Sequence, residues 1–207
     1  IMMYDPILAA ARESAHGYGS LPFWSWNDRL EPDELRRQIR AMHKIGMHGF
    51  FMHARGGLET EYLSDEWFAA VAASVDEAKK LGMEAWSYDE NGWPSGFAGG
   101  ALLTDPDNHA RFLAAAVEDA YPTGDDVLGV WRIADGVCSP AAPEDPAPYH
   151  VVRERADASY VDVLRADITA KFLTATHAEY KRRTGADFGG AMPGFVTDEP
   201  QYYRYAT

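Results

Sequence analysis

The sequence is poor in basic residues, in cysteine and in long apolar runs, and each shortage excludes a class of protein. Its 19 Lys and Arg residues stand against 32 Asp and Glu residues, which gives a formal net charge of −13. Such a chain repels nucleic-acid phosphates and anionic lipid surfaces, so we expect no nucleic acid and no membrane among its partners. The single cysteine, Cys138, excludes an internal disulfide and a cysteine-rich zinc site.

Several sequence motifs are missing as well. No apolar run approaches the roughly 20 residues of a membrane span, and the N-terminus lacks the pattern of a signal peptide, so the localisation stays open. His-x-x-x-His and the glycine-rich loops of nucleotide-binding proteins are absent, and Ser95 lies in Pro94-Ser95-Gly96 rather than in a nucleophile elbow. Zinc, nucleotide and serine-nucleophile chemistry lose their support, and carboxylate chemistry remains.

What the sequence does contain is a regular alternation of strand and helix patterns. With 46% hydrophobic and 13% aromatic residues, the chain has ample material for a packed core. Strand patterns occupy residues 22–27, 49–54, 84–88 and 194–198, and helix patterns occupy residues 6–14, 32–46, 64–82 and 161–184. This order predicts an α/β fold in which the four strands are parallel neighbours in sequence order.

The alternation fails between residues 99 and 158. Residues 112–117 and 127–133 favour strands, and residues 140–148 form a proline-rich loop, so we interpret residues 101–154 as an inserted β/loop segment after the third strand. The chain as a whole, residues 1–207, then supplies about four βα units, whereas a (β/α)8 TIM barrel runs to roughly 250 residues.

We therefore expect the N-terminal part of a TIM barrel. The chain begins at Ile1 rather than at a methionine, which favours a piece of a longer protein. A half-barrel exposes apolar strand faces and edges, which soluble proteins avoid. The remaining strands are expected to come from further chain or from a second copy.

Polar and aromatic side chains gather where the predicted strands end. Chemistry collects at the carboxyl ends of parallel strands, because side chains there are rigidly held and reach a common pocket. Aromatic rings at such a place offer flat apolar faces to the C–H groups of a sugar. The candidate substrate-binding residues are Trp24, Trp26, Asn27, His53, Arg55, Asp89, Glu90, Trp93 and Tyr202, and the candidate catalytic residues are Asp198 and Glu199.

These residues also have second interpretations. The run Asp198-Glu199-Pro200 is equally typical of an exposed turn, and a tryptophan such as Trp86 also serves to fill a core. Because side chains alternate along a strand, one carboxylate of each adjacent pair should face the pocket and the other should be structural. His53 and Arg55 suit either hydroxyl groups or a carboxylate of a ligand. Four further histidines, which lie on predicted helices or loops, are expected to be solvated or to serve in packing: His43, His109, His150 and His177.

Two carboxyl groups are sufficient for glycoside cleavage. One of them, held beside aromatic groups, protonates the leaving oxygen, while an ionised one activates water or attacks the sugar. We assign the acid role to Glu199, whose longer side chain reaches further, and an orienting or hydroxyl-binding role to Asp198. The sequence assigns no metal ligands.

Three short motifs resemble one family. They are Phe-Trp-Ser-Trp-Asn at residues 23–27 before the helix start at 30–35, Tyr-Asp-Glu-Asn-Gly-Trp-Pro-Ser-Gly at 88–96, and Phe-Val-Thr-Asp-Glu-Pro at 195–200. Together they resemble the bacterial glycoside hydrolases related to α-L-rhamnosidases, glycoside hydrolase family 106.

The resemblance implies a (β/α)8 catalytic domain with an insertion after the third strand, and hydrolysis of a terminal deoxysugar from a carbohydrate substrate. It also implies calcium as a cofactor, and activity that belongs to the full-length protein rather than to this piece. The alternative is a non-catalytic carbohydrate-binding or structural segment, which keeps the pocket and lacks the chemistry.

Overall fold

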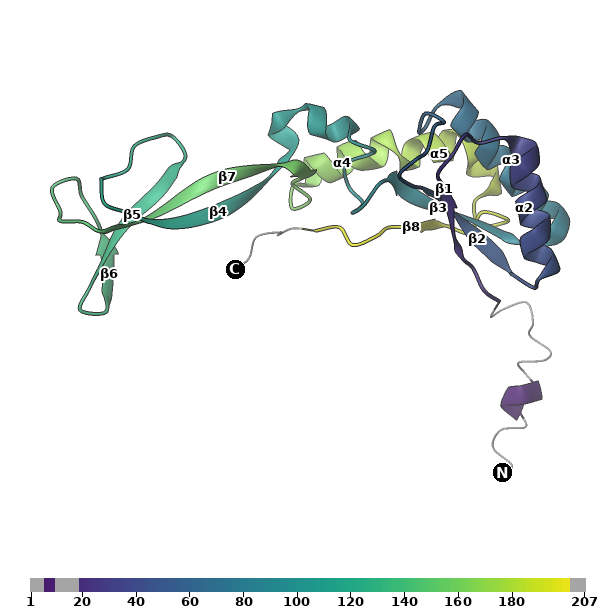
Figure 1. Cartoon of the computed structure of the whole chain (residues 1–207), viewed down its shortest axis with the longest axis horizontal. Helices are drawn as coiled ribbons and strands as arrows, with labels where there is room; N and C mark the ends of the chain where they lie inside the picture. The colour runs from purple at the N-terminus through teal and green to yellow at the C-terminus, as the bar shows by residue number, and fades with distance from the viewer. Residues whose placement is uncertain (1–5, 10–18, 202–207) are drawn as a thin grey trace. The chain divides into compact units, whose positions relative to one another are not determined.

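The computed structural model describes residues 6–9 and 19–201, and the chain divides into two compact units. Among the described residues, the first unit holds residues 6–9, 19–101 and 169–200, and the second holds residues 102–168 and 201 (Figure 1). Residues 6–9 are helical, and the rest of the predicted helix 6–14 lies outside the described residues.

The first unit is built on a four-stranded sheet. Its strands are β1 (Phe23–Trp26), β2 (Gly49–Ala54), β3 (Glu84–Asn91) and β8 (Phe195–Val196). They lie in the order β1-β2-β3-β8, and each neighbouring pair is parallel. The predicted set of four parallel strands in sequence order is confirmed, and the carboxyl ends of the strands meet at one edge of the sheet.

The helices connect these strands. They are α2 (Pro32–Lys44), α3 (Asp65–Leu81), α4 (Ala166–Ala175) and α5 (His177–Thr184), with a short 3-10 helix, η3 (Gly185–Asp187). The predicted start of α3 is confirmed, because the Ser64 hydroxyl accepts a hydrogen bond of 3.1 Å from the Trp67 N–H. Gly82 ends α3 in the left-handed conformation, with φ of 66°.

The predicted helix 161–184 is wrong in two places. Val161 belongs to a strand of the second unit, and helical structure begins only at Ala166. Thr176 then separates α4 from α5, where its hydroxyl donates a hydrogen bond of 2.8 Å to the Phe172 carbonyl. A threonine bonded back to the preceding turn competes with regular helical bonding and often bends a helix.

The Ser64 cap gives a direct test of the start of α3. We expect Ser64→Ala to lower the free energy of unfolding by about 1 kcal/mol, because the Trp67 N–H then loses its acceptor. Ser64→Asp keeps an acceptor and should stay close to wild type. Urea unfolding followed by circular dichroism measures both variants, and equal stability of Ser64→Ala and wild type would contradict the cap.

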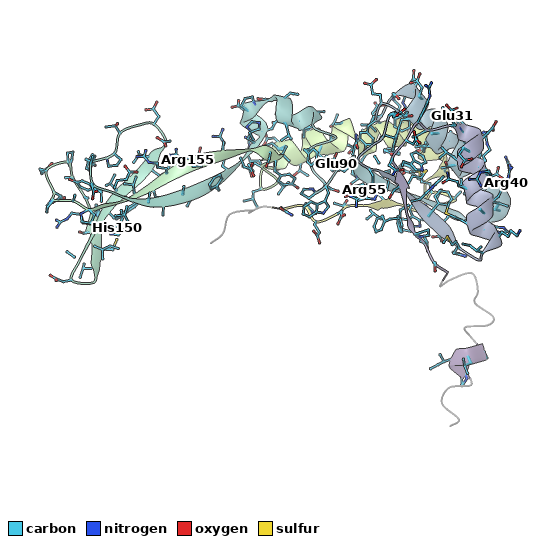
Figure 2. All side chains as sticks on the ribbon, viewed as in Figure 1. Glu31, Arg40, Arg55, Glu90, His150 and Arg155 are labelled. Atoms are coloured by element: carbon cyan, nitrogen blue, oxygen red, sulfur yellow. The ribbon has the colours of Figure 1, made fainter. Side chains whose placement is uncertain are left out.

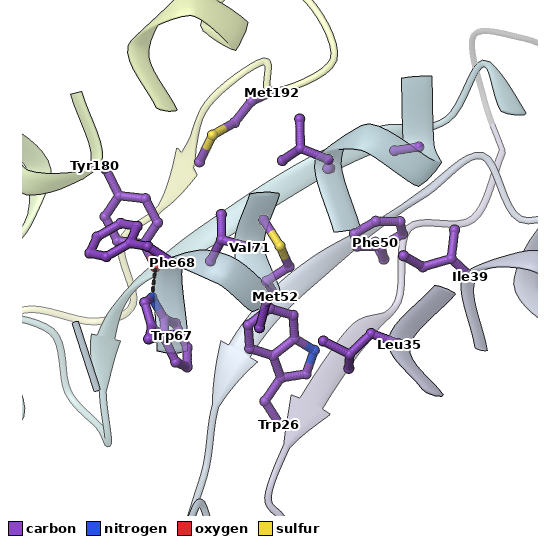
Figure 3. Close-up of a cluster of buried hydrophobic side chains, with 14 of the residues drawn as sticks. Trp26, Leu35, Ile39, Phe50, Met52, Trp67, Phe68, Val71, Tyr180 and Met192 are labelled. Carbon is purple, nitrogen blue, oxygen red and sulfur yellow. Dashed lines mark hydrogen bonds between the residues drawn. The ribbon is translucent and has the colours of Figure 1, made fainter. Parts of the chain in front are cut away.

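The core of the first unit lies between one face of the sheet and the helices. Trp26, Phe50 and Met52 on the strands pack with Leu35 and Ile39 of α2 and with Trp67, Phe68 and Val71 of α3 (Figure 3). Trp67 is fully buried, and its indole N–H donates a hydrogen bond of 3.1 Å to the Tyr180 hydroxyl of α5. The core therefore fastens α5 to α3.

The opposite face of the sheet carries a second set of rings, which we name the aromatic face: Phe23, Phe51, His53, Trp86 and Tyr88. Neighbouring ring centroids lie 5.2 Å apart for Phe23 and Phe51 and 5.7 Å apart for Phe51 and Trp86. Phe23 remains 55% exposed. Both faces of these strands are thus apolar, as is typical of parallel strands that are covered on both sides.

The second unit contains an antiparallel sheet. Its elements are η1 (Ala101–Thr104), η2 (Pro106–Asn108), β4 (His109–Glu118), β5 (Val127–Ala134), β6 (Val137–Pro140) and β7 (Tyr149–Val161), in the strand order β4-β7-β5-β6. The strands predicted at 112–117 and 127–133 are confirmed, whereas β6 and β7 were not predicted. Arg153 of β7 makes a bidentate contact of 3.1 Å with the Glu118 carboxylate of β4.

The described residues form a mixed α/β structure with two sheets. Among the residues that the structure describes, no helix combines the length and the apolar character needed to cross a membrane.

Candidate functional site

The carboxyl end of β3 departs from regular strand geometry. Met52 of β2 pairs with Ser87, and Ala54 pairs with Asn91, so two steps along β2 correspond to four along β3. The extra length holds Asp89 and Glu90, and both side chains are fully buried. Strand irregularities of this kind occur beside active sites, where they re-aim side chains. Strict alternation therefore does not separate this pair into one inward and one outward carboxylate.

Glu90 holds the loop that follows β3. Its carboxylate accepts hydrogen bonds from the backbone N–H groups of Asn91, Gly96, Phe97, Ala98 and Gly99. Four of these bonds measure 2.7 to 3.2 Å. Burial raises the pKa of Glu90, and the hydrogen bonds from the loop act in the opposite direction. All the geometry points to a loop-fixing role for Glu90, which Figure 2 labels.

Asp89 ties three segments together. It accepts hydrogen bonds of 2.6 Å from the Ser95 hydroxyl and 2.6 Å from the Thr197 hydroxyl. His177 of α5 places its Nε2 atom 3.6 Å from Asp89 Oδ2. Burial lowers the pKa of His177, and the Asp89 charge opposes that shift. Asp89 thereby links the end of β3, the loop after it and the end of β8.

Asp198 is fixed just beyond β8. The Tyr88 hydroxyl donates a hydrogen bond of 3.1 Å to Asp198 Oδ2. The Asp198 N–H donates to Ser95 Oγ at 3.0 Å, and the Ser95 N–H donates to the Asp198 carbonyl at 2.9 Å. Burial, and then the Asp198 charge, raise the pKa of Tyr88, so the phenol stays protonated and remains a donor at neutral pH.

Glu199, unlike Asp198, is not anchored by side-chain contacts within the described residues. Its side chain is exposed, and within residues 19–201 no hydrogen bond or ion pair holds its carboxylate. Its backbone is left-handed, with φ of 43°, a conformation that costs a non-glycine residue free energy. Such strain persists where the surrounding structure imposes it, often at functional sites. The chain thus presents Glu199 to solvent directly beside the anchored Asp198.

His53 lies on the aromatic face at the end of β2. It is 3% exposed, and its ring stacks on the Tyr88 ring with the centroids 3.7 Å apart. Neither ring nitrogen has a hydrogen-bond partner among the described residues. Burial lowers the pKa of His53 to about 4, the positive charge of Arg55 adds to this shift, and Asp198 opposes it. His53 is therefore a neutral imidazole at neutral pH. Arg55, two residues further along the chain, is exposed, and Figure 2 labels it.

The lowered pKa of His53 predicts how stability depends on pH. In the unfolded chain His53 binds a proton below its ordinary pKa of 6.5, whereas in the fold it does so only near pH 4. Between these values the unfolded state binds more protons, so stability falls as the pH drops from 6.5 to 4. We expect His53→Phe to lose less stability over this interval than wild type, as measured by urea unfolding at a series of pH values.

The same replacement at the exposed His43 serves as the control for this pH dependence. His43→Phe should retain the wild-type profile, including the part that comes from carboxylates elsewhere in the chain. Parallel profiles of wild type and His53→Phe would show that His53 titrates normally.

The remaining predicted site residues separate into three groups. Trp24 and Trp26 lie on the helix-covered face, where Trp26 is 2% exposed and the Trp24 indole N–H donates to Gln38 Oε1 at 2.8 Å. The expected contact of these two side chains with substrate is therefore replaced by core packing. Asn27 is exposed, and Trp93 is 44% exposed. Tyr202 lies outside the described residues.

Sequence reasoning missed four members of this arrangement: Tyr88, Ser95, Thr197 and His177. Ser95 was considered only as a nucleophile, and His177 was assigned a solvated or packing role. A usable signal existed for Ser95, because it follows Asp89 by 6 residues in the same strand and loop, and a hydroxyl group can donate to a carboxylate. Thr197 gave no such signal, since it lies 108 residues from its acceptor, Asp89. His177 gave no such signal, since its proximity to Asp89 depends on the packing of α5 against the sheet.

The carboxylates do not form a calcium site within the part of the chain that the structure describes. No group of three or more His, Cys, Asp or Glu side chains there is arranged to hold a metal ion. Calcium takes six to eight oxygen ligands, and the oxygens of Asp89 and Glu90 are engaged by hydroxyl and N–H donors. The calcium expected from the resemblance does not fit these residues.

A separate pocket of about 500 Å³ lies among the loops that follow β1 and β2. Its wall is acidic, with Glu31, Glu59, Glu61 and Glu66 beside Arg29. His53, Tyr88, Asp89, Asp198 and Glu199 do not line this pocket.

Comparisons with known proteins give little guidance. No family model matches the chain, and no curated protein matches its sequence. A solved structure of a rhamnosidase from Novosphingobium sp. PP1Y is similar over 59% of this chain, with 16% sequence identity and a TM-score of 0.39. The matched part spans 15% of that rhamnosidase chain. A likeness at this TM-score supports no inference about the fold or the function of this chain.

Proposed function

We propose that the chain belongs to the catalytic domain of a glycoside hydrolase, which removes a terminal deoxysugar, as in an α-L-rhamnoside, by carboxylate acid/base catalysis. The observation that carries the proposal is the cluster at the carboxyl ends of β2, β3 and β8. There an anchored carboxylate, Asp198, lies with Tyr88 and His53, and Glu199 is presented beside it. Polar groups gathered at this end of parallel strands are the usual setting of a catalytic site in α/β folds.

In this proposal the two carboxylates have different roles. Glu199 acts as the general acid and donates its proton to the leaving oxygen, because it is unanchored and reaches outward. Asp198, held by Tyr88 and Ser95, orients the site and accepts a hydrogen bond from a sugar hydroxyl. The exposed ring of Trp93 offers a stacking surface. A second catalytic carboxylate, which activates water or attacks the sugar, comes from outside this chain segment.

The proposal includes a (β/α)8 barrel of which the first unit contributes four strands. Two features favour it: the parallel order β1-β2-β3-β8, and an aromatic face that remains partly exposed at Phe23. Further strands would pair at β1 and β8, each of which has one neighbour within the described residues, and would cover the aromatic face. They come from additional chain or from a second copy.

The test is hydrolysis by the intact protein that carries this chain. We expect it to release 4-nitrophenol from 4-nitrophenyl α-L-rhamnopyranoside and to act much more slowly on 4-nitrophenyl β-D-glucopyranoside. Binding of the rhamnoside without release would favour the non-catalytic carbohydrate-binding alternative. If the intact protein neither binds nor hydrolyses any member of a panel of aryl glycosides, the proposed function is overturned.

A further inference from the structure

His53 is a buried side chain whose two ring nitrogens lack hydrogen-bond partners in the part of the chain that the structure describes. The imidazole is 3% exposed, and neither Nδ1 nor Nε2 has a hydrogen-bond partner among the described residues. Buried polar atoms without partners are rare in folded proteins, because each costs free energy unless something satisfies it. The ring is held in place between Phe23, at 5.4 Å, and Tyr88, at 3.7 Å. Its orientation is therefore set by packing, and within residues 19–201 both nitrogens lack the hydrogen-bond partner that a ligand would supply.

The charge state of this ring decides which ligand it suits. The low pKa of His53 makes it a neutral imidazole, in which one nitrogen donates a hydrogen bond and the other accepts one. A sugar hydroxyl group also donates and accepts, so it complements either nitrogen. A carboxylate group only accepts, and it would leave one ring nitrogen unsatisfied.

The neighbouring groups favour the same class of ligand. Asp198 offers a carboxylate whose Oδ2 is taken by Tyr88, and within residues 19–201 no hydrogen bond uses its Oδ1. An ionised carboxylate on a ligand would be repelled by Asp198, whereas a hydroxyl would donate to it. Arg55 is exposed and therefore offers only a solvent-screened attraction to an anion.

We propose that His53 and Asp198 together bind two neighbouring hydroxyl groups of an uncharged sugar ring, and that this pair selects against sugars that carry a carboxylate. This inference rests on the proposed function, because it specifies the ligand of the same site. His53 supplies a donor and an acceptor, and Asp198 supplies an acceptor. Tyr88 connects the two side chains, because its ring stacks on His53 and its hydroxyl donates a hydrogen bond to Asp198.

The experiment titrates the intact protein with methyl α-L-rhamnopyranoside and with methyl α-D-galacturonopyranoside, followed by ¹⁵N NMR of the histidine rings. We expect the rhamnoside to bind at least 10-fold more tightly than the uronide and to shift the His53 ring nitrogens. His53→Phe keeps a planar ring against Tyr88 and loses both hydrogen bonds, so the Kd for the rhamnoside should rise roughly 10-fold. His43→Phe, the same change at an exposed position, should leave the Kd unchanged.

The outcomes separate this inference from the proposed function. Tighter binding of the uronide, or an unchanged Kd in a folded His53→Phe variant, would overturn the inference while carbohydrate binding stands. If His53→Phe does not fold, the wild-type ring decides, because unmoved His53 ¹⁵N signals at saturating rhamnoside overturn the inference as well. If the intact protein binds neither of the two sugars, both the proposed function and this inference are overturned.

Discussion

Replacing Glu199 with glutamine should lower the turnover of the intact protein on an alkyl α-L-rhamnoside by roughly 100-fold or more, the usual contribution of a general acid. Glutamine keeps the size and the hydrogen-bonding capacity of the side chain but carries no proton to donate. Because Glu199 is exposed and unanchored within the described residues, the fold should be unaffected. Steady-state rates at saturating substrate, with circular dichroism as the check on folding, measure the effect.

The leaving group provides an internal control for this prediction. On a 2,4-dinitrophenyl glycoside, whose leaving group needs little protonation, the loss in Glu199→Gln should shrink. Asp198→Asn serves as the matched variant, and its loss should be similar on both substrates, because Asp198 acts through hydrogen bonds rather than as the acid. Full activity of Glu199→Gln on the alkyl glycoside, together with loss of activity in Asp198→Asn, would show that the roles of the two carboxylates are reversed.

Glu90→Gln should lower the free energy of unfolding by about 3 kcal/mol, because a buried acceptor of several N–H groups becomes an amide. Glutamine has one acceptor oxygen where the carboxylate has two, so its amide nitrogen, a donor, faces either the N–H groups of Gly96, Phe97 and Ala98 or those of Asn91 and Gly99. The loop should therefore open, and the exchange of its amide hydrogens should accelerate. Urea unfolding and hydrogen exchange of the N–H groups at 96–99 measure the two effects.

Glu59→Gln is the control for the Glu90 prediction, since Glu59 is an exposed loop carboxylate. It should change stability by less than about 0.5 kcal/mol. Unchanged protection of the loop amides in Glu90→Gln would contradict a loop-fixing role. Activity should fall in Glu90→Gln as well, because the same loop contains Ser95, which holds the backbone of Asp198.

The order of elements in the first unit was predictable because its signals are local. Pro32 and Ser64 mark helix starts, and Gly82 marks a helix end. The apolar runs outside these helices are too short for helices and therefore indicate strands. The second unit was harder, because β7 carries Arg153, Glu154 and Arg155 in its middle. These charges resemble a solvated loop in sequence, yet Arg153 pairs across the sheet with Glu118, a contact that only the folded register provides.

The candidate site could be located from the sequence but not resolved into roles. Both faces of the parallel strands are apolar, so the pattern does not tell which of Phe23 and Trp24 faces the helices. The irregularity of β3 at Asp89 and Glu90 likewise leaves no mark in the alternation of residue types. One partner of Asp89, Thr197, lies 108 residues further along the chain, and only the pairing of β8 with β3 brings its hydroxyl to the Asp89 carboxylate.

The most direct measurement is a crystal structure of the intact protein with a non-hydrolysable thio-linked rhamnoside. We predict that the sugar lies at the carboxyl ends of β2, β3 and β8, with its ring hydroxyls bound to His53 and Asp198. The Glu199 carboxyl should lie about 3 Å from the sulfur that replaces the leaving oxygen. A sugar bound elsewhere, such as in the acidic pocket beside Glu59 and Glu61, or a Glu199 directed away from the linkage, would contradict it.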